Sequence, residues 1–231
     1  MKQYKFFFSY FLLLVLNIAF VNAQTPTGPW DSTFRPNNWA LKVGQFISYQ
    51  HSSKDIVFLG NSITANVEWR ELLGMENIKN RGISGDISYG ILERLDEVIN
   101  GKPAKVFILI GINDISRNVP DDRILDNYRK IITRIQAGSP ATKIYFHTLM
   151  PVNNEFTQFK NHYNKDEHIA YVNSGLKKIA EETKITLINL HPVLMDANGK
   201  LDKKYTIDGL HINADGYKLW AALLQNGGYL K

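Results

Sequence analysis

The chain has no cysteine among its 231 residues, so neither a disulfide nor a lipid-modified N-terminal cysteine can anchor it, and its fold must rest on a packed core. It also has little net charge, because 27 Lys and Arg stand against 22 Asp and Glu, and no block of basic residues concentrates the excess of +5. This balance gives no reason to expect a nucleic-acid partner. Internal repeats and low-complexity linkers are absent too, and about 200 residues suffice for one domain with a full core.

Long apolar runs are scarce as well, and the most extended one lies at the N-terminus. Two lysines precede an apolar stretch over residues 6–20, and a small-residue cleavage site ends at Ala23. The stretch is shorter than the roughly 20 residues that a spanning helix needs. This pattern predicts a cleaved signal peptide over 1–23 and a single domain over 24–231. We therefore expect a periplasmic or secreted protein without stable membrane insertion; a retained membrane anchor is the alternative.

Short apolar runs alternate with segments of helical periodicity along the rest of the chain. Five runs indicate strands, at residues 56–59, 77–81, 105–110, 143–149 and 186–190. Apolar residues at helical spacing fill the connections, where Asp121 and Asn213 are suited to cap helices. Strands that are apolar throughout are buried on both faces, and helical connections join parallel strands. We predict an α/β fold, a three-layer α/β/α sandwich with a five-stranded parallel sheet in the flavodoxin-like order 2-1-3-4-5.

The first predicted strand stops abruptly at Gly60-Asn61-Ser62. In open parallel sheets, ligands bind beyond the carboxyl ends of the strands, where a serine can act as nucleophile if a base is near. Alone, this run is weak evidence for catalysis and is more typical of an ordinary turn. Three further segments give it partners: residues 80–86 after the second strand, 111–114 after the third, and 208–211 near the C-terminus.

Together these segments hold the groups that ester hydrolysis requires: a nucleophile, a base, a group that orients the base, and donors for the oxyanion. Ser62 can be the nucleophile and His211 the base, and Asp208, three residues earlier, can hold the imidazole within a tight turn. The backbone N–H groups of Ser62 and Gly82, together with the Asn113 side-chain amide, can form the oxyanion hole. Gly82 suits this role because the absence of a Cβ lets the backbone approach substrate closely.

The four blocks resemble those of the SGNH/GDSL hydrolases, a family named for the Ser, Gly, Asn and His that occur here as Ser62, Gly82, Asn113 and His211. Their order and spacing agree with that family over essentially the whole mature chain. The Gly-x-Asn-Asp and Asp-x-x-His blocks are its more specific marks. The resemblance implies a three-layer α/β/α fold, metal-free and cofactor-free serine hydrolysis of esters, and a triad of Ser62, His211 and Asp208.

The chain departs from the family pattern at one place in the first block. The family usually has Asp after the first glycine, and this chain has Asn61. The position lies outside the triad but affects the hydrogen bonding of the turn, since Asn can donate where Asp cannot. We expect Asn61→Asp to be the best-tolerated change in this run.

Other side chains have weaker claims on the site. Asn153, Trp69 and Arg81 are candidate substrate contacts, whereas we expect Gly85 to be an ordinary loop glycine. His147, near the end of the fourth strand, is better explained as a packed or hydrogen-bonded histidine. The remaining histidines have no partner pattern and no metal-ligand spacing; these are His51, His162, His168 and His191.

The resemblance also suggests a substrate class. Compact family members with a signal peptide resemble esterases that remove O-acetyl groups from carbohydrates such as sialic acids and plant glycans, so we expect a small-molecule or glycan ester. A lysophospholipase or short-chain thioesterase is the alternative, which a long apolar groove would favour. A non-catalytic glycan-binding module is a distant alternative, because it predicts a broken triad and all four blocks are intact.

Overall fold

The computed structural model describes residues 30–231, so the predicted signal peptide lies outside the described residues. A five-stranded parallel sheet of order β2-β1-β3-β4-β5 forms the centre of the molecule, which confirms the predicted topology. The strands are β1 Ile56–Gly60, β2 Ile78–Gly82, β3 Lys105–Leu109, β4 Lys143–His147 and β5 Thr186–Ile188.

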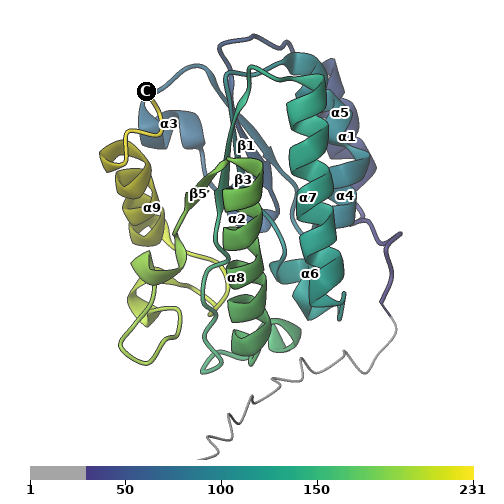
Figure 1. Cartoon of the computed structure of the whole chain (residues 1–231). Coiled ribbons are helices and arrows are strands. Elements are labelled where there is room, and N and C mark those ends of the chain that lie inside the picture. The colour runs from purple at the N-terminus through teal and green to yellow at the C-terminus, as the bar shows by residue number, and fades with distance from the viewer. Residues whose placement is uncertain (1–29) are drawn as a thin grey trace, which may run out of the picture.

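Helices cover both faces of the sheet, with α3 and α9 on one side and α7 on the other (Figure 1). The longer helices are α1 Trp39–Ser48, α5 Leu95–Gly101, α7 Asp121–Gly138, α8 Asp166–Thr183 and α9 Ala214–Asn226. The shorter ones are α2 Ser62–Ala65, α3 Trp69–Leu73, α4 Ser88–Glu93 and α6 Ile112–Ser116, with 3-10 turns η1 Lys160–His162, η2 His191–Val193 and η3 Lys203–Tyr205. Within the described residues, no helix is both long and apolar enough to cross a bilayer.

An aromatic row crosses the sheet on the side of α3 and α9. The ring of Phe107 stacks between Phe58 at 4.9 Å and Tyr145 at 4.6 Å, and these residues occupy matching positions on β3, β1 and β4. Alternate residues face the other layer, where Phe146 packs against Tyr128 of α7. Since successive side chains of a strand point to opposite faces, nearly all-apolar strands are buried on both sides, as their sequences predicted.

Local helix signals were only partly right. Asn213 caps α9 as predicted, accepting a hydrogen bond from the Gly216 N–H at 3.1 Å. Asp121 is not a cap; it is the first residue of α7, and its carboxylate pairs instead with His168 at 2.8 Å. The helical spacing of apolar residues from 87 to 98 predicts one helix, but the structure has two, α4 and α5, which meet at Arg94. The Arg94 guanidinium turns inward at the break and pairs with buried Asp86.

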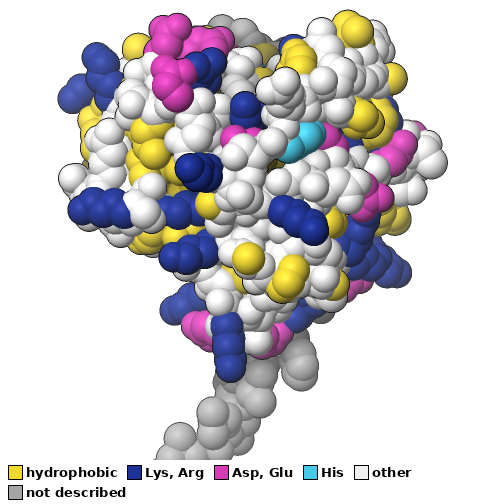
Figure 2. Space-filling view, turned by 90° about the horizontal axis from the view of Figure 1, so that it is seen from above, with side chains coloured by type: hydrophobic (Ala, Val, Ile, Leu, Met, Phe, Trp, Pro, Cys, Tyr) yellow, Lys and Arg dark blue, Asp and Glu magenta, His cyan; other side chains and the backbone are white. Residues whose placement is uncertain are grey.

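The strands end at one edge of the sheet, near α6, and begin at the opposite edge. Figure 2 looks onto the edge where they begin, and Lys and Arg side chains are spread over that face. Exposed lysines at strand starts contribute to it, including Lys54, Lys102 and Lys143. Part of the basic excess therefore lies far from the edge that carries Ser62 and Asn113.

A buried carboxyl links α6 to α4. Asp114 is fully buried, and its oxygens accept hydrogen bonds from the Ser88 N–H at 3.0 Å and the Ser88 hydroxyl at 2.5 Å. Burial raises the pKa of Asp114 to about 7 despite these bonds. The contact fixes α6 against the neighbouring helix layer.

The raised pKa of Asp114 predicts a pH-dependent stability. Between the ordinary pKa near 3.8 and the folded value near 7, the folded state keeps a proton that the unfolded state has lost, so stability falls as pH rises. Asp114→Asn removes this loss. One pKa unit is worth about 1.4 kcal/mol, so the melting temperature of Asp114→Asn relative to wild type should rise by at least about 2 °C from pH 5 to pH 8. Parallel pH profiles would contradict this, and exposed Asp126→Asn on α7 is the control.

Candidate active site

β1 places Ser62 at the carboxyl edge of the sheet, because α2 begins there directly after the strand. The Asn61 Oδ1 accepts a hydrogen bond from the Ile63 N–H at 3.0 Å and so caps this short helix. The Ser62 Oγ lies 2.9 Å from Nε2 of His211, whose Nδ1 lies 2.7 Å from Oδ2 of Asp208. The structure therefore brings the three predicted residues into one hydrogen-bonded chain.

A tight turn holds the Asp208 carboxylate in place. Its Oδ1 accepts the backbone N–H groups of Leu210 at 2.9 Å and His211 at 2.7 Å. Burial alone would raise the pKa of Asp208, but the hydrogen bonds from the backbone and side chain of His211 and from Leu210 outweigh it, and the pKa lies below its ordinary value. An ionised Asp208 favours the proton on Nδ1 of His211, which leaves the Nε2 lone pair facing Ser62.

Asn113 lies on α6, beyond the end of β3, in the same cleft as Ser62 and His211. Its side-chain NH₂ donates to the Asp86 carbonyl at 2.9 Å, and its Oδ1 lies 2.9 Å from Nε2 of His162. One amide hydrogen of Asn113 thus has no acceptor among residues 30–231. It is available to an oxyanion in the cleft.

The structure corrects the expected roles of the two second-block glycines. Gly82 is the last residue of β2, its N–H donates to the Asn80 side chain at 2.9 Å, and it packs against the backbone of α2. A donor already bonded there cannot serve an oxyanion. Gly85 lines the cleft instead, with a φ of +82°, and its N–H has no acceptor among the described residues. A backbone in this left-handed region favours glycine.

His162 is the site residue that sequence reasoning missed. The sequence shows no partner pattern for it, but it lies in η1, in the connection between β4 and α8, and binds Asn113. Because the Asn113 NH₂ faces Asp86, its Oδ1 faces His162, whose Nε2 must then carry the proton. Burial, reinforced by nearby His211 and Arg117, lowers the pKa of His162 to about 4. No sequence motif marks this residue, because its partner is 49 positions away.

Trp69 and Arg81 do not reach the cleft, contrary to expectation. Trp69 is 1% exposed and stacks on Phe58 at 4.1 Å, so it belongs to the core. Arg81 is 3% exposed, and its guanidinium donates to Glu97 of α5 at 2.7 Å. Both side chains are occupied by structural contacts.

Asn153 also supports the site instead of lining it. It is fully buried; its side chain donates to the Leu201 carbonyl and accepts from the Glu155 N–H. Its backbone N–H donates to the Gly209 carbonyl at 2.8 Å, within the turn that carries Asp208. His147 is packed as expected, since its ring bonds the Ile108 carbonyl and the Trp220 indole.

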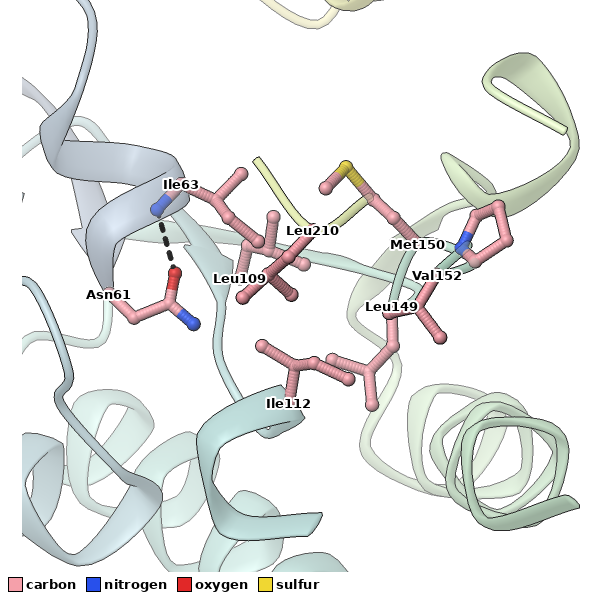
Figure 3. Close-up of a pocket in the computed structure, with 9 residues that line it drawn as sticks. Asn61, Ile63, Leu109, Ile112, Leu149, Met150, Val152 and Leu210 are labelled. Atoms are coloured by element: carbon pink, nitrogen blue, oxygen red, sulfur yellow. Dashed lines mark hydrogen bonds between the residues drawn. The ribbon is translucent and has the colours of Figure 1, made fainter. Parts of the chain in front are cut away.

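A small apolar pocket lies beside the Ser62 turn (Figure 3). Asn61 is the polar member of its lining, which otherwise consists of Ile63, Leu109, Ile112, Leu149, Met150, Pro151, Val152 and Leu210. The Asn61 NH₂ is buried without a hydrogen-bond partner in the described part of the chain. A carboxylate here would place an unpaired charged oxygen among apolar side chains, which is costly. The position of Asn61 in this pocket therefore argues against the expectation that Asn61→Asp is well tolerated.

The family model for GDSL-like lipases and acylhydrolases matches residues 58–219. The chain belongs to this family. The matched range includes Ser62, Asp208 and His211. As a member of this family, the protein is a carboxylic ester hydrolase, and it is called the hydrolase below.

Individual relatives extend this comparison. An N-acylneuraminate cytidylyltransferase of Escherichia coli is 32% identical over 72% of the hydrolase, which spans only 38% of that longer protein. The alpha2 subunit of platelet-activating factor acetylhydrolase IB from Rattus norvegicus is 23% identical, with 78% of the hydrolase and 79% of the subunit covered. The crystal structure of a GDSL-like lipase from Bacteroides thetaiotaomicron superimposes with a TM-score of 0.71 at 26% identity, covering 82% of the hydrolase and 96% of the lipase.

The contact between His162 and Asn113 predicts a specific kinetic effect. If His162 orients the Asn113 amide, His162→Ala should lower kcat about tenfold with little change in KM, and His162→Gln should recover part of the loss. In an Asn113→Ala background, His162→Ala should have almost no further effect on kcat. Independent, multiplicative losses in the double variant would contradict this role, and exposed His51→Ala is the matched control.

Proposed function

We propose that the hydrolase is a serine esterase that removes O-acetyl groups from carbohydrates through a triad of Ser62, His211 and Asp208. The observation that carries this proposal is the hydrogen-bonded chain from the Ser62 Oγ through His211 to Asp208, at 2.9 and 2.7 Å. These are the distances at which a base can take a proton from a nucleophile while a carboxylate orients it.

The reaction proceeds in two steps. His211 takes the Ser62 proton as the Oγ attacks the ester carbonyl, and the tetrahedral oxyanion is held by the N–H groups of Ser62 and Gly85 and the Asn113 amide. The alcohol leaves with the proton from His211. His211 then deprotonates a water molecule that attacks the acyl-enzyme, which releases the acid and restores Ser62.

The composition of the cleft supports a hydrophilic alcohol as the leaving group. Only Phe159 and Leu210 are apolar among the lining residues, which also include Ser62, Asn66, Ser84, Gly85, Asn113, Ser116, Arg117, His162 and His211. Hydroxyl and amide side chains can hydrogen-bond sugar hydroxyls, whereas a long acyl chain would need an apolar groove. The name of one relative, an acetylhydrolase, fits the release of an acetyl group, and that of another, an enzyme of N-acylneuraminate, fits a sugar as the alcohol. A lysophospholipase or short-chain thioesterase remains the alternative.

We further propose that the protein is exported to the periplasm or secreted, on the basis of the apolar stretch at residues 6–20 and the small-residue site at Ala23. The mature chain should then begin at Gln24. Intact-mass measurement of protein recovered from the exported fraction of its host tests this, and a full-length chain retained in the cells would contradict it.

The esterase proposal is tested by acetate release. Purified enzyme should release acetate from at least one of O-acetylated sialic acid, acetylxylan and acetylated pectin, and should prefer short p-nitrophenyl esters. Ser62→Ala should lower kcat by about 10⁴-fold or more and abolish labelling by a fluorophosphonate probe. Normal turnover by Ser62→Ala would remove Ser62 as the nucleophile. Preference for a lysophospholipid or long acyl chains would favour the alternative, and absence of labelling in wild type would favour a binding module.

A further inference from the structure

Arg117 differs from every other arginine of the chain. Seven of the eight arginines pair with a carboxylate, in the pairs Arg35–Glu93, Arg70–Glu76, Arg81–Glu97, Arg94–Asp86, Arg123–Asp126, Arg129–Glu182 and Arg134–Asp96. Arg117 has no carboxylate partner within residues 30–231. Arginine is always charged in proteins, so its guanidinium presents an uncompensated positive charge.

This unpaired charge lies in the cleft. Arg117 follows α6, and its backbone N–H donates to the carbonyl of Asn113 at 3.2 Å, one helical turn earlier. Residues four apart on a helix lie on the same face, so the guanidinium and the Asn113 amide both line the cleft that holds Ser62 and His211. With His162 neutral, Arg117 is the one lining side chain whose charge is fixed at neutral pH.

The guanidinium is held by stacking, and its hydrogen-bonding edge is not used. Its central carbon lies 3.2 Å from the centre of the Phe34 ring, and no side-chain hydrogen bond of Arg117 forms within the described residues. The carboxylates of Asp31 and Asp114 attract the guanidinium through longer-range electrostatic interactions, without forming an ion pair with it. Asp31 accepts two hydrogen bonds from Thr33, and Asp114 is buried against Ser88. A stacked guanidinium with a free edge is arranged for a planar anion, which it can bind with two parallel hydrogen bonds.

The excess of basic residues in the protein does not account for the unpaired guanidinium of Arg117. Many of the other basic side chains lie on the opposite edge of the sheet, as Figure 2 shows. The arginines elsewhere are neutralised by carboxylates. A carboxylate partner for Arg117 would therefore come from a bound molecule.

We propose that Arg117 binds a carboxylate on the alcohol part of the ester, so that the preferred substrates are O-acetylated acidic sugars. This inference rests on the proposed carbohydrate esterase function and narrows its substrate class. Arg117 is a specificity-determining residue in this scheme, and Ser84 and Ser116, which line the same cleft, are placed to bind sugar hydroxyls.

The test compares acetate release from two substrates that differ only at the carboxyl group, which is a charged carboxylate in an O-acetylated glucuronate and is neutral in its methyl ester. Wild type should show a kcat/KM at least about tenfold higher for the acid, a preference that weakens with added salt. In Arg117→Gln this ratio should fall close to one, and Arg117→Lys should retain part of it. Arg123→Gln, which changes an exposed arginine on α7, should keep the wild-type ratio. Melting temperatures establish that each variant is folded.

The outcomes separate this inference from the proposed function. Equal turnover of the acid and its methyl ester by wild type would overturn the carboxylate subsite and leave the carbohydrate esterase intact. Turnover of p-nitrophenyl acetate with neither sugar ester cleaved would overturn both. An Arg117-dependent preference for an acetylated glycerophospholipid over the acetylated sugars would show that the anion bound is a phosphate of a lipid, and would overturn the acidic-sugar assignment.

Discussion

A buried ion pair between Arg94 and Asp86 ties together the segments that form the active-site edge. Both side chains are almost completely buried, and the guanidinium donates to Asp86 at 2.9 Å and to the Gly60 carbonyl at 3.1 Å. The backbone carbonyl of Asp86 in turn accepts a hydrogen bond from the Asn113 side-chain amide. Arg94 and Asp86 thus connect the end of β1 before Ser62, the loop that carries Gly85, and the helix that carries Asn113.

A buried ion pair of this kind does not by itself make the folded protein more stable. Burial raises the pKa of Asp86 against the opposing effect of Arg94, which shows how much solvation both charges lose. Replacing a buried pair by apolar residues is often neutral or stabilising, whereas removing one partner costs about 3–5 kcal/mol. The directional bond from Arg94 to the Gly60 carbonyl explains the presence of the pair better than net stability does, because apolar side chains could fill the space but could not hold that carbonyl.

The connection between β4 and α8 completes the cleft from the other side. The Tyr163 hydroxyl donates to the Asp208 carbonyl and accepts from the Phe159 N–H, while the Phe159 ring contacts the rings of both His162 and His211 edge-on, at 5.8 and 5.0 Å between centroids. This segment therefore contacts Asp208 and His211 on one side of the cleft and, through His162, Asn113 on the other.

Local sequence patterns do not predict these contacts. Strands, helices and the Ser62, Asp208 and His211 positions follow from local patterns, because apolar runs and an Asp-x-x-His turn are short-range signals. The partners of Arg81 and His162 lie on other elements, and the choice between Gly82 and Gly85 depends on backbone direction, which composition does not encode.

The neutral state of His162 decides how the oxyanion side is arranged. Its Nδ1 is buried without a partner in the described part of the chain, so an imidazolium would bury an unsatisfied N–H next to His211 and Arg117. The pKa near 4 that results keeps the ring neutral at physiological pH, with its one proton on Nε2. The Asp86 carbonyl can only accept, so it holds the nitrogen of Asn113 toward Asp86 and the oxygen toward His162. The Nε2 proton of His162 reinforces this orientation, because a rotated amide would set two donors against each other on one side and two acceptors on the other. The free amide hydrogen of Asn113 is therefore oriented without substrate; in the proposed reaction, such a preorganised donor loses no energy to reorientation when the oxyanion forms.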